Sequence, residues 1–243
     1  MRSGPMGGSR SGVPYQILAG VEPVRGGWLV APGNLQGITL APQPAHVLES
    51  LADVLDYRPT FTVVALHAPV GAPDDAGEWR EADLAARQRL GRRRASVVRA
   101  PSRAVLEAKT FEEAREIDPS LDIVQWRSMA KAAEAIREVQ SWRQRVVWEV
   151  HPELALMEMN DGEPVEYGRR TQHGRKVRRE LLISKLPGAE RVLAARPSGV
   201  REDKLIDALA DLWVARRIIA RAITRMASDA KWNDEGVRMD IVC

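Results

Sequence analysis

The chain of 243 residues is 44% hydrophobic and 28% charged, which excludes a disordered protein, a collagen or a coiled coil as a description of the whole chain. Its 36 Lys and Arg exceed its 33 Asp and Glu by only three, a surplus too small to indicate a nucleic-acid partner by itself. The single cysteine, Cys243, excludes an intramolecular disulfide and a zinc site made of cysteines.

Membrane and secretion signals are missing from the sequence. No stretch approaches 18 consecutive apolar residues, so we expect no membrane span and no membrane partner. The first 13 residues are rich in Gly, Ser and Arg and lack the apolar core of a signal peptide. We therefore expect residues 1–13 to be a flexible leader, residues 14–243 to be one domain, and the protein to be cytoplasmic.

The first third of the domain predicts a mixed sheet. Three short apolar runs separated by glycine-bearing turns predict an antiparallel meander. These runs cover residues 15–21, 28–31 and 38–40. Apolar residues at helical spacing over 45–55 predict a helix, and the run 61–66 predicts a further strand. A strand–helix–strand crossover adds a parallel strand pair to the meander.

The middle of the chain is predicted to be a helical insertion around residues 78–143, followed by a strand over 145–150 that Pro152 stops. The predicted helices cover residues 79–90, 105–117, 124–142, 176–186 and 203–226. The first of them is expected to end at Gly91. The fold class is therefore α/β: an antiparallel meander plus parallel strands, covered by helices.

Acidic side chains fall where the predicted strands end and where the last helix begins. They are Glu22, Glu149, Asp203 and Asp207. Carboxylates gathered at one rim of such a sheet can bind hard divalent cations, and a pair of such ions can activate water and stabilise the leaving oxygen of a phosphodiester. The plainer interpretation is that Asp203, Asp207 and Asp211 form a solvated helix edge, because they lie nearly opposite the leucine stripe of that helix.

Histidine and arginine residues have two interpretations each. His67 follows a predicted strand and is either a general base or metal ligand, or a hydrogen-bonded structural group. His151, before Pro152, is most simply part of a strand terminator. Eight arginines lie between Arg80 and Arg103, and they either bind phosphates or form a solvated or ion-paired surface. Phosphate-binding loops, dinucleotide glycine fingerprints and serine nucleophile elbows are absent.

Several stretches together resemble the domain of unknown function 429 family over nearly the whole chain after the leader. They are Gly20-Val-Glu-Pro-Val-Arg-Gly-Gly-Trp28, Ala65-Leu-His-Ala-Pro-Val-Gly71, Arg80-Glu-Ala-Asp83 with Arg87, Leu90 and Gly91, Ser96 to Arg103, Glu149-Val-His-Pro-Glu153, Gly174-Arg175 with Arg178, and Glu202-Asp-Lys-Leu-Ile-Asp-Ala208. The resemblance implies a ribonuclease H-like fold and a nuclease activity that depends on a divalent metal, Mg²⁺ or Mn²⁺.

The same resemblance implies a site. Glu22, Glu149 and Asp203 would hold the metal, with Asp207 and His67 completing the catalytic set. The arginines matched for substrate binding are Arg25, Arg80, Arg87, Arg103 and Arg175.

Two positions depart from the family pattern, in which the first and fourth strands each deliver an Asp. This chain has Glu22 and His67 there. Glutamate moves its oxygens by about 1 Å, a displacement that can lower a rate roughly 10²-fold. Imidazole suits Mn, Fe or Zn better than Mg²⁺. The departures predict either a changed metal preference or a site that has lost catalysis.

The sequence therefore leaves two main hypotheses. The first is a metal-dependent phosphodiester hydrolase acting on a nucleic acid or nucleotide. The alternative is a catalytically inactive regulatory protein on the same scaffold, binding nucleic acid, a nucleotide or a protein. Nucleotide handling as in the related sugar kinases is a third, which the absent phosphate loops disfavour. A dimer is compatible with the sequence, which specifies no oligomeric state.

Overall fold

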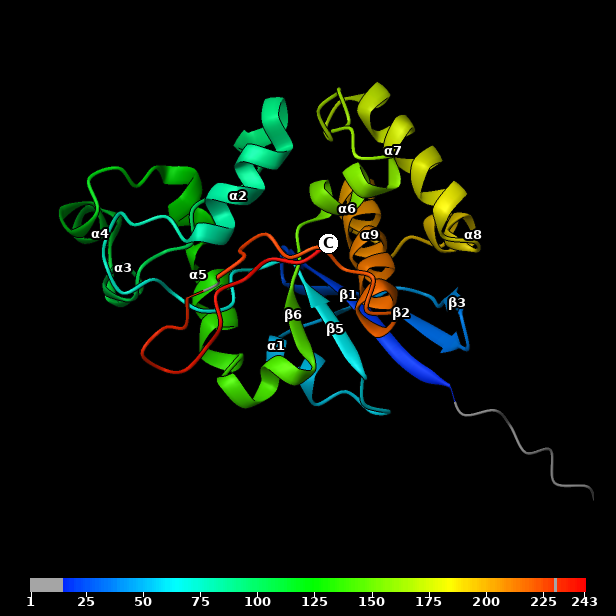
Figure 1. Ribbon diagram of the computed structural model, residues 1–243, viewed down its shortest axis with the longest axis horizontal. Helices are drawn as coiled ribbons and strands as arrows, with labels where there is room; N and C mark the ends of the chain where they lie inside the picture. Colours follow the sequence, from blue (N-terminus) through cyan, green and yellow to red (C-terminus); the bar gives the residue numbers. More distant parts are fainter. Residues whose placement is uncertain (1–14, 230) are drawn as a thin grey trace, which may run out of the picture.

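A computed structural model describes residues 15–229 and 231–243, so the predicted leader over residues 1–13 lies outside the described residues. Its centre is a six-stranded sheet in the order β3-β2-β1-β5-β6, with β4 pairing β2 (Figure 1). The strands are β1 (Gln16–Val24), β2 (Gly27–Gln36), β3 (Thr39–Pro42), β4 (His46–Leu48), β5 (Val63–Leu66) and β6 (Val147–Glu149).

The sheet is mixed, as the sequence predicted. Strands β1, β2 and β3 pair antiparallel, and β5 pairs parallel with both β1 and β6. The turn between β1 and β2 uses Gly26 and Gly27, both at positive φ, a conformation that favours glycine. The meander, the added parallel strands and the covering helices confirm the α/β class.

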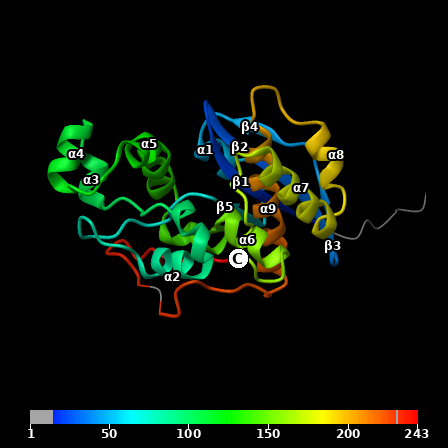
Figure 2. The same cartoon turned by 90° about the horizontal axis from the view of Figure 1, so that it is seen from above.

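Helices cover both faces of the sheet. They are α1 (Leu51–Leu55), α2 (Glu81–Leu90), α3 (Arg103–Glu107), α4 (Phe111–Ile117), α5 (Ile123–Glu138), α6 (Pro152–Met159), α7 (Gln172–Lys185), α8 (Ala189–Ala194) and α9 (Glu202–Ile219), with 3-10 turns η1 (Gly91–Ser96) and η2 (Ser141–Arg145). Figures 1 and 2 both show α3, α4 and α5 on one side of the molecule and α7, α8 and α9 on the other.

Strand β1 divides the core because successive side chains point to opposite faces. Leu18 packs in the cluster that includes α9, whereas Ala19 packs in the cluster that includes α1 and α5. Gly20 faces α9 so closely that a Cβ atom there would lie 2.0 Å from the Ala208 carbonyl oxygen and 2.3 Å from the Leu212 nitrogen. Backbone contact between β1 and α9 therefore requires glycine at this position.

Several predicted boundaries were wrong for local reasons. The predicted helix over 45–55 is β4 followed by α1, because Ser50 caps α1 by accepting a hydrogen bond from Asp53. The helix over 105–117 is two helices, α3 and α4, and Thr110 caps the second. The helix over 203–226 ends at Ile219, before Arg221 adopts a left-handed conformation with φ of 55°.

Helices α6 and α8 were not predicted. Residues 152–153, taken as a strand terminator, begin α6, and seven of its eight residues are buried. A short helix buried on all sides has no amphipathic periodicity to reveal it. Among the described residues, no helix combines the length and apolar character that crossing a bilayer requires.

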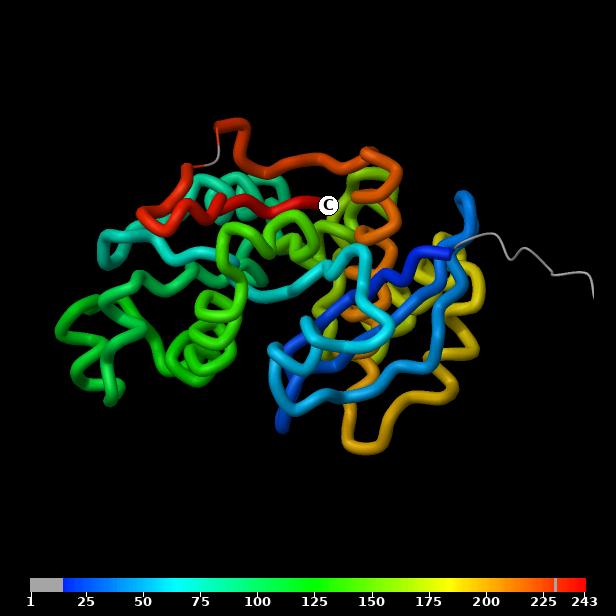
Figure 3. The backbone as a smooth tube through the Cα atoms, turned by 90° about the horizontal axis from the view of Figure 1, so that it is seen from below, coloured from blue at the N-terminus to red at the C-terminus, as the bar shows by residue number. Residues whose placement is uncertain are grey.

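The end of the chain returns to the sheet. Val242 forms bridges with Val150 and with Arg225, and Cys243 exchanges backbone hydrogen bonds with Thr224 (Figure 3, red). The Cys243 side chain is buried in a small cluster with residues of α2 and α6.

Candidate metal centre

Strand register brings Glu22 and His67 together. Val21 of β1 pairs with Leu66 of β5. The residues that follow them, Glu22 and His67, therefore lie at the same edge of the sheet. Because side chains alternate, Glu22 shares the face of Leu18, which packs toward α9, and His67 follows on that face. Glu22 is fully buried.

Two groups bind the Glu22 carboxylate. Nδ1 of His67 lies 2.5 Å from Oε1, and Nζ of Lys204 donates to Oε2 at 2.7 Å. Burial raises the pKa of Glu22, but the charges and hydrogen bonds of His67 and Lys204 outweigh burial and lower the pKa to about 2. Glu22 is therefore ionised, and its carboxylate accepts the hydrogen bonds from these two groups.

Helix α9 places further acids beside this pair. Asp207 and Asp211 are fully buried, so the predicted solvated helix edge is wrong. The reason is that α9 lies against the sheet as well as α6 and α7, and thirteen of its 18 residues are buried. The face opposite its leucines is covered by the rim that carries Glu22.

Asp211 has the most unusual environment. Within the described part of the chain, neither of its carboxylate oxygens has a hydrogen-bond partner. One of them lies within 4.8 Å of ligand atoms of Glu22 and His67, so these three side chains form a group that could hold a metal ion. Burial and the charges of Glu22 and Asp207 raise the pKa of Asp211 well above its ordinary value.

Asp207 and Asp203 differ in how they are compensated. Nη1 of Arg169 donates to Oδ2 of Asp207 at 2.8 Å, while Oδ1 has no partner among the described residues. Burial and Glu22 raise the pKa of Asp207 to about 7, against the effect of Arg169. Arg201 binds both oxygens of Asp203, at 2.9 and 2.7 Å. The Asp203 carboxylate is therefore already paired with Arg201.

Glu149 lies on the other face of the sheet. It pairs in register with Leu66, whose side chain packs in the cluster opposite α9, so its carboxylate points away from Glu22. Arg80 binds both of its oxygens, at 2.6 and 2.8 Å, and the Val70 N–H donates to one of them at 2.6 Å. The metal set expected from the sequence, Glu22 with Glu149 and Asp203, is not the set that the structure brings together.

His151 holds the ring of His67 from the side. The two ring centroids are 4.9 Å apart in an edge-to-face arrangement. The Glu153 N–H donates to Nδ1 of His151, which leaves Nε2–H to donate to the Ser96 carbonyl. Burial lowers the pKa of His151 to about 3, so the ring is neutral. The interpretation of His151 as a strand terminator missed this contact.

The five arginines predicted to bind substrate lie apart from this group. Arg80 is committed to Glu149 and Asp83, and Arg25 is exposed. The other three also have partners: Arg87 binds carbonyls of Arg94 and Val97, Arg103 binds Glu235, and Arg175 binds the Arg170 carbonyl and lies near Glu202. No described contact joins any of the five to Glu22, His67 or Asp211.

Lys204 and Arg169 are the cations next to the acids, and the sequence analysis did not single them out. A signal for Lys204 does exist, because Lys204, Asp207 and Asp211 recur at spacings of three and four, which places them on one helix face. For Arg169, which lies in a loop before α7, the sequence offers no comparable signal.

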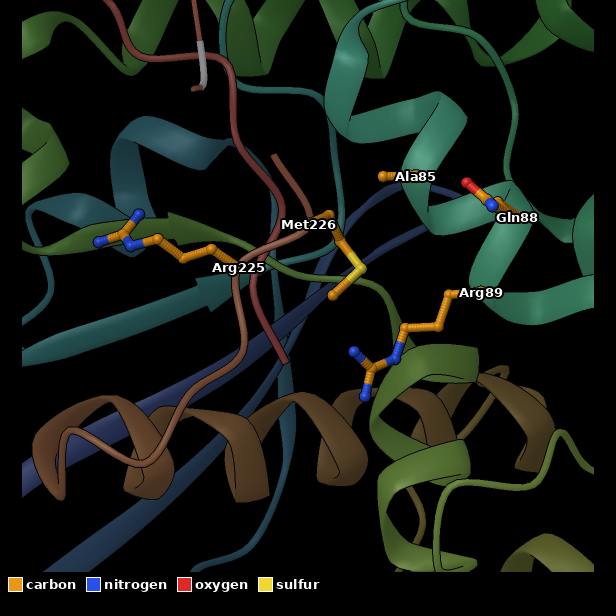
Figure 4. A pocket seen from close by; sticks show the side chains of 5 residues that line it. All are labelled: Ala85, Gln88, Arg89, Arg225 and Met226. Atoms are coloured by element: carbon orange, nitrogen blue, oxygen red, sulfur yellow. The ribbon is translucent and has the colours of Figure 1, made fainter. Parts of the chain in front are cut away.

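A separate pocket of about 340 Å³ lies between α2 and the segment after α9. Figure 4 shows its lining residues, Ala85, Gln88, Arg89, Arg225 and Met226. Arg89 pairs with Glu158, and Arg225 extends away from the other four and pairs with Asp240. The pocket shares no residue with the Glu22 group.

Comparison with known families identifies the chain. The model of the family described as "Protein of unknown function (DUF429)" matches residues 20–231. The chain belongs to this family. The match contains Glu22, His67 and Asp211. Comparisons with curated proteins and with solved structures gave no match.

Proposed function

We propose that this protein is a divalent-metal-dependent phosphodiester hydrolase, and that Glu22, His67 and Asp211 hold the metal. The proposal rests on Asp211: among the described residues neither of its buried oxygens has a hydrogen-bond partner, and one of them lies within 4.8 Å of ligand atoms of Glu22 and His67. A buried carboxylate without a partner is costly, and a cation removes that cost. A cluster of buried acids that lowers the stability of the folded protein in this way is typical of a functional site.

The donor set indicates which metal the site takes. Two carboxylates and one imidazole suit Mn²⁺ or Zn²⁺ better than Mg²⁺, which prefers oxygen ligands alone. When bound, such an ion supplies Lewis acidity toward a phosphoryl oxygen and activates water. Of Mg²⁺ and Mn²⁺, the proposal therefore favours Mn²⁺.

The neighbouring side chains suit a phosphate substrate. Arg169 and Lys204 are partly exposed, at 31% and 22% of their side-chain surface, while their carboxylate partners are buried. Their N–H groups that face solvent would bind phosphoryl oxygens. Asp207 has a pKa of about 7 and an Oδ1 without a partner in the described part of the chain, so it is matched to take up a proton near neutral pH. His151 keeps the His67 ring in place.

We propose that this fold belongs to the ribonuclease H-like superfamily. A three-stranded antiparallel meander continued by two parallel strands on the other side of β1 supports that placement. The support is architectural only, because the same scaffold can host different chemistry.

The test is cleavage of single- and double-stranded DNA, RNA, and linear and cyclic oligonucleotides with Mn²⁺, Mg²⁺ or Zn²⁺. We expect cleavage that Mn²⁺ supports best, that Asp211→Asn abolishes, and that the control Glu190→Gln, an exposed acid of α8, leaves unchanged. Inactivity on every substrate with every metal would overturn the proposal.

One observation favours a binding protein as the second candidate. Lys204 and Arg169 already neutralise Glu22 and Asp207, as expected of a rim that binds anions without turnover. Oligonucleotide binding that weakens with salt, without cleavage under any metal, would favour this candidate.

A further inference from the structure

We infer that the centre takes a single divalent ion, and that the ammonium group of Lys204, bound to Glu22, supplies the positive charge that a second ion would otherwise bring. The inference rests on the proposed metal centre and adds its stoichiometry and the role of one residue. Its basis is the contact of Lys204 with Glu22, the carboxylate at the middle of the group.

The charge balance of the buried acids supports one ion. With the His67 ring neutral, as metal ligation requires, Glu22, Asp207 and Asp211 contribute three negative charges when ionised, and Lys204 and Arg169 contribute two positive charges. One divalent ion changes the sum from −1 to +1, which a phosphodiester with its single negative charge would neutralise. A second divalent ion would leave a sum of +3 in a buried site, which is strongly unfavourable.

The other charged groups packed around the site are already balanced. Glu153 is bound through both oxygens by Arg178, and Asp203 is bound through both oxygens by Arg201. His151 is neutral. These groups therefore leave no uncompensated negative charge for a second ion.

Lys204 acts on the whole group and not on Glu22 alone. Its Nζ occupies Oε2 of Glu22 at 2.7 Å, and its charge also lowers the pKa of both Asp207 and Asp211. Asp211 remains without a hydrogen-bond partner among the described residues, whereas both oxygens of Glu22 are engaged. The arrangement leaves the Asp211 carboxylate for the incoming ion, while Lys204 occupies Oε2 of Glu22.

A cation this close repels a divalent ion. Lys204 should therefore weaken metal binding and also limit the number of ions that the site binds to one. Charges a few ångströms apart at a protein site interact strongly enough to change an affinity at least about tenfold. Replacing Lys204 by Met also frees Oε2 of Glu22 as a ligand. Both effects strengthen metal binding in the variant.

The experiment is titration of the full chain with Mn²⁺, followed by electron paramagnetic resonance of the free ion and by calorimetry. We expect one Mn²⁺ per wild-type chain and at least about tenfold tighter first binding in Lys204→Met. Lys204→Gln, which keeps a polar contact with Glu22, should behave like Lys204→Met and serves if that variant fails to fold. Lys204→Arg retains the charge and should keep the wild-type affinity.

The matched control is Lys176→Met, which removes an exposed cation of α7 that pairs with the exposed Glu180 and leaves no buried acid unpaired. Its Mn²⁺ affinity should equal that of the wild type. Two ions per wild-type chain, or an unchanged affinity in Lys204→Met and Lys204→Gln, would overturn the inference and leave the proposed function standing. Absence of binding in the wild type and in every variant would overturn both.

Discussion

Replacing Asp211 by Asn tests the energetic state of the candidate centre. In the metal-free protein, burial and the nearby acids raise the pKa of Asp211 well above its ordinary value. The native protein therefore keeps a proton that the unfolded chain has released, and stability falls as pH rises from the unfolded pKa to the native pKa. Asn carries no titrating proton, so Asp211→Asn escapes this loss.

The size of the effect follows from linkage. One proton retained only by the native state costs roughly 1 kcal/mol of stability for each pH unit. Between about pH 6 and 8, we expect the metal-free variant to gain on the wild type as the pH rises, by up to roughly 1 kcal/mol for each pH unit, which corresponds to about 2 to 4 °C in Tm for a protein of this size.

Manganese should reverse this order. Metal binding requires the ionised Asp211 carboxylate, so Mn²⁺ should raise the Tm of the wild type, more at higher pH, and should not raise that of Asp211→Asn. The assay is thermal and urea unfolding with EDTA or with Mn²⁺ at several pH values.

Asp203→Asn is the matched control on the same helix, because Asp203 is bound by Arg201 and is outside the metal-capable group. It should retain the Mn²⁺ response. The reasoning would be refuted if metal-free Asp211→Asn were less stable than the wild type throughout this pH range, or if it kept the full Mn²⁺ response.

Three further predictions concern the frame around the centre. Arg80→Ala leaves the buried Glu149 and Asp83 carboxylates without their shared cation and should cost about 3 to 5 kcal/mol in urea unfolding, whereas an unchanged midpoint would contradict this. Gly20→Ala places a Cβ 2.0 Å from the Ala208 carbonyl oxygen, so α9 must shift. We expect the free energy of unfolding to fall by at least about 1 to 3 kcal/mol and the near-ultraviolet circular dichroism spectrum to change. A variant with native-like stability and spectrum would contradict the close packing of β1 against α9. Burial raises the pKa of the Cys243 thiol to about 12, so Ellman's reagent should label it only on unfolding, and rapid labelling of the native protein would be contrary to its burial.

The sheet could be predicted from the sequence because its strands leave local signals. The glycines between the first apolar runs and the crossover before residues 61–66 were sufficient for the mixed topology. Helix α6 gave no such signal, since it is short and seven of its eight residues are buried, which leaves no polar face. Helix ends were wrong where a cap or a left-handed residue, such as Ser50 or Arg221, overrode the hydrophobic pattern.

The candidate site could be predicted only in part. Glu22 and His67 were expected together from the family resemblance, and the register of β1 with β5 brings them together. Glu149 could not be placed, because the face it occupies depends on the register of β6. Asp211 was assigned to a solvated edge, since the sequence does not reveal that other elements cover that side of α9.

The central claim is that one divalent ion binds between Glu22, His67 and Asp211, and anomalous diffraction from crystals of the protein containing Mn²⁺ tests it most directly. The account predicts one anomalous peak in each chain, with donor atoms of these three residues about 2.0 to 2.6 Å from it. A peak at Glu149 or Asp203 instead, or two peaks beside Glu22, would contradict it.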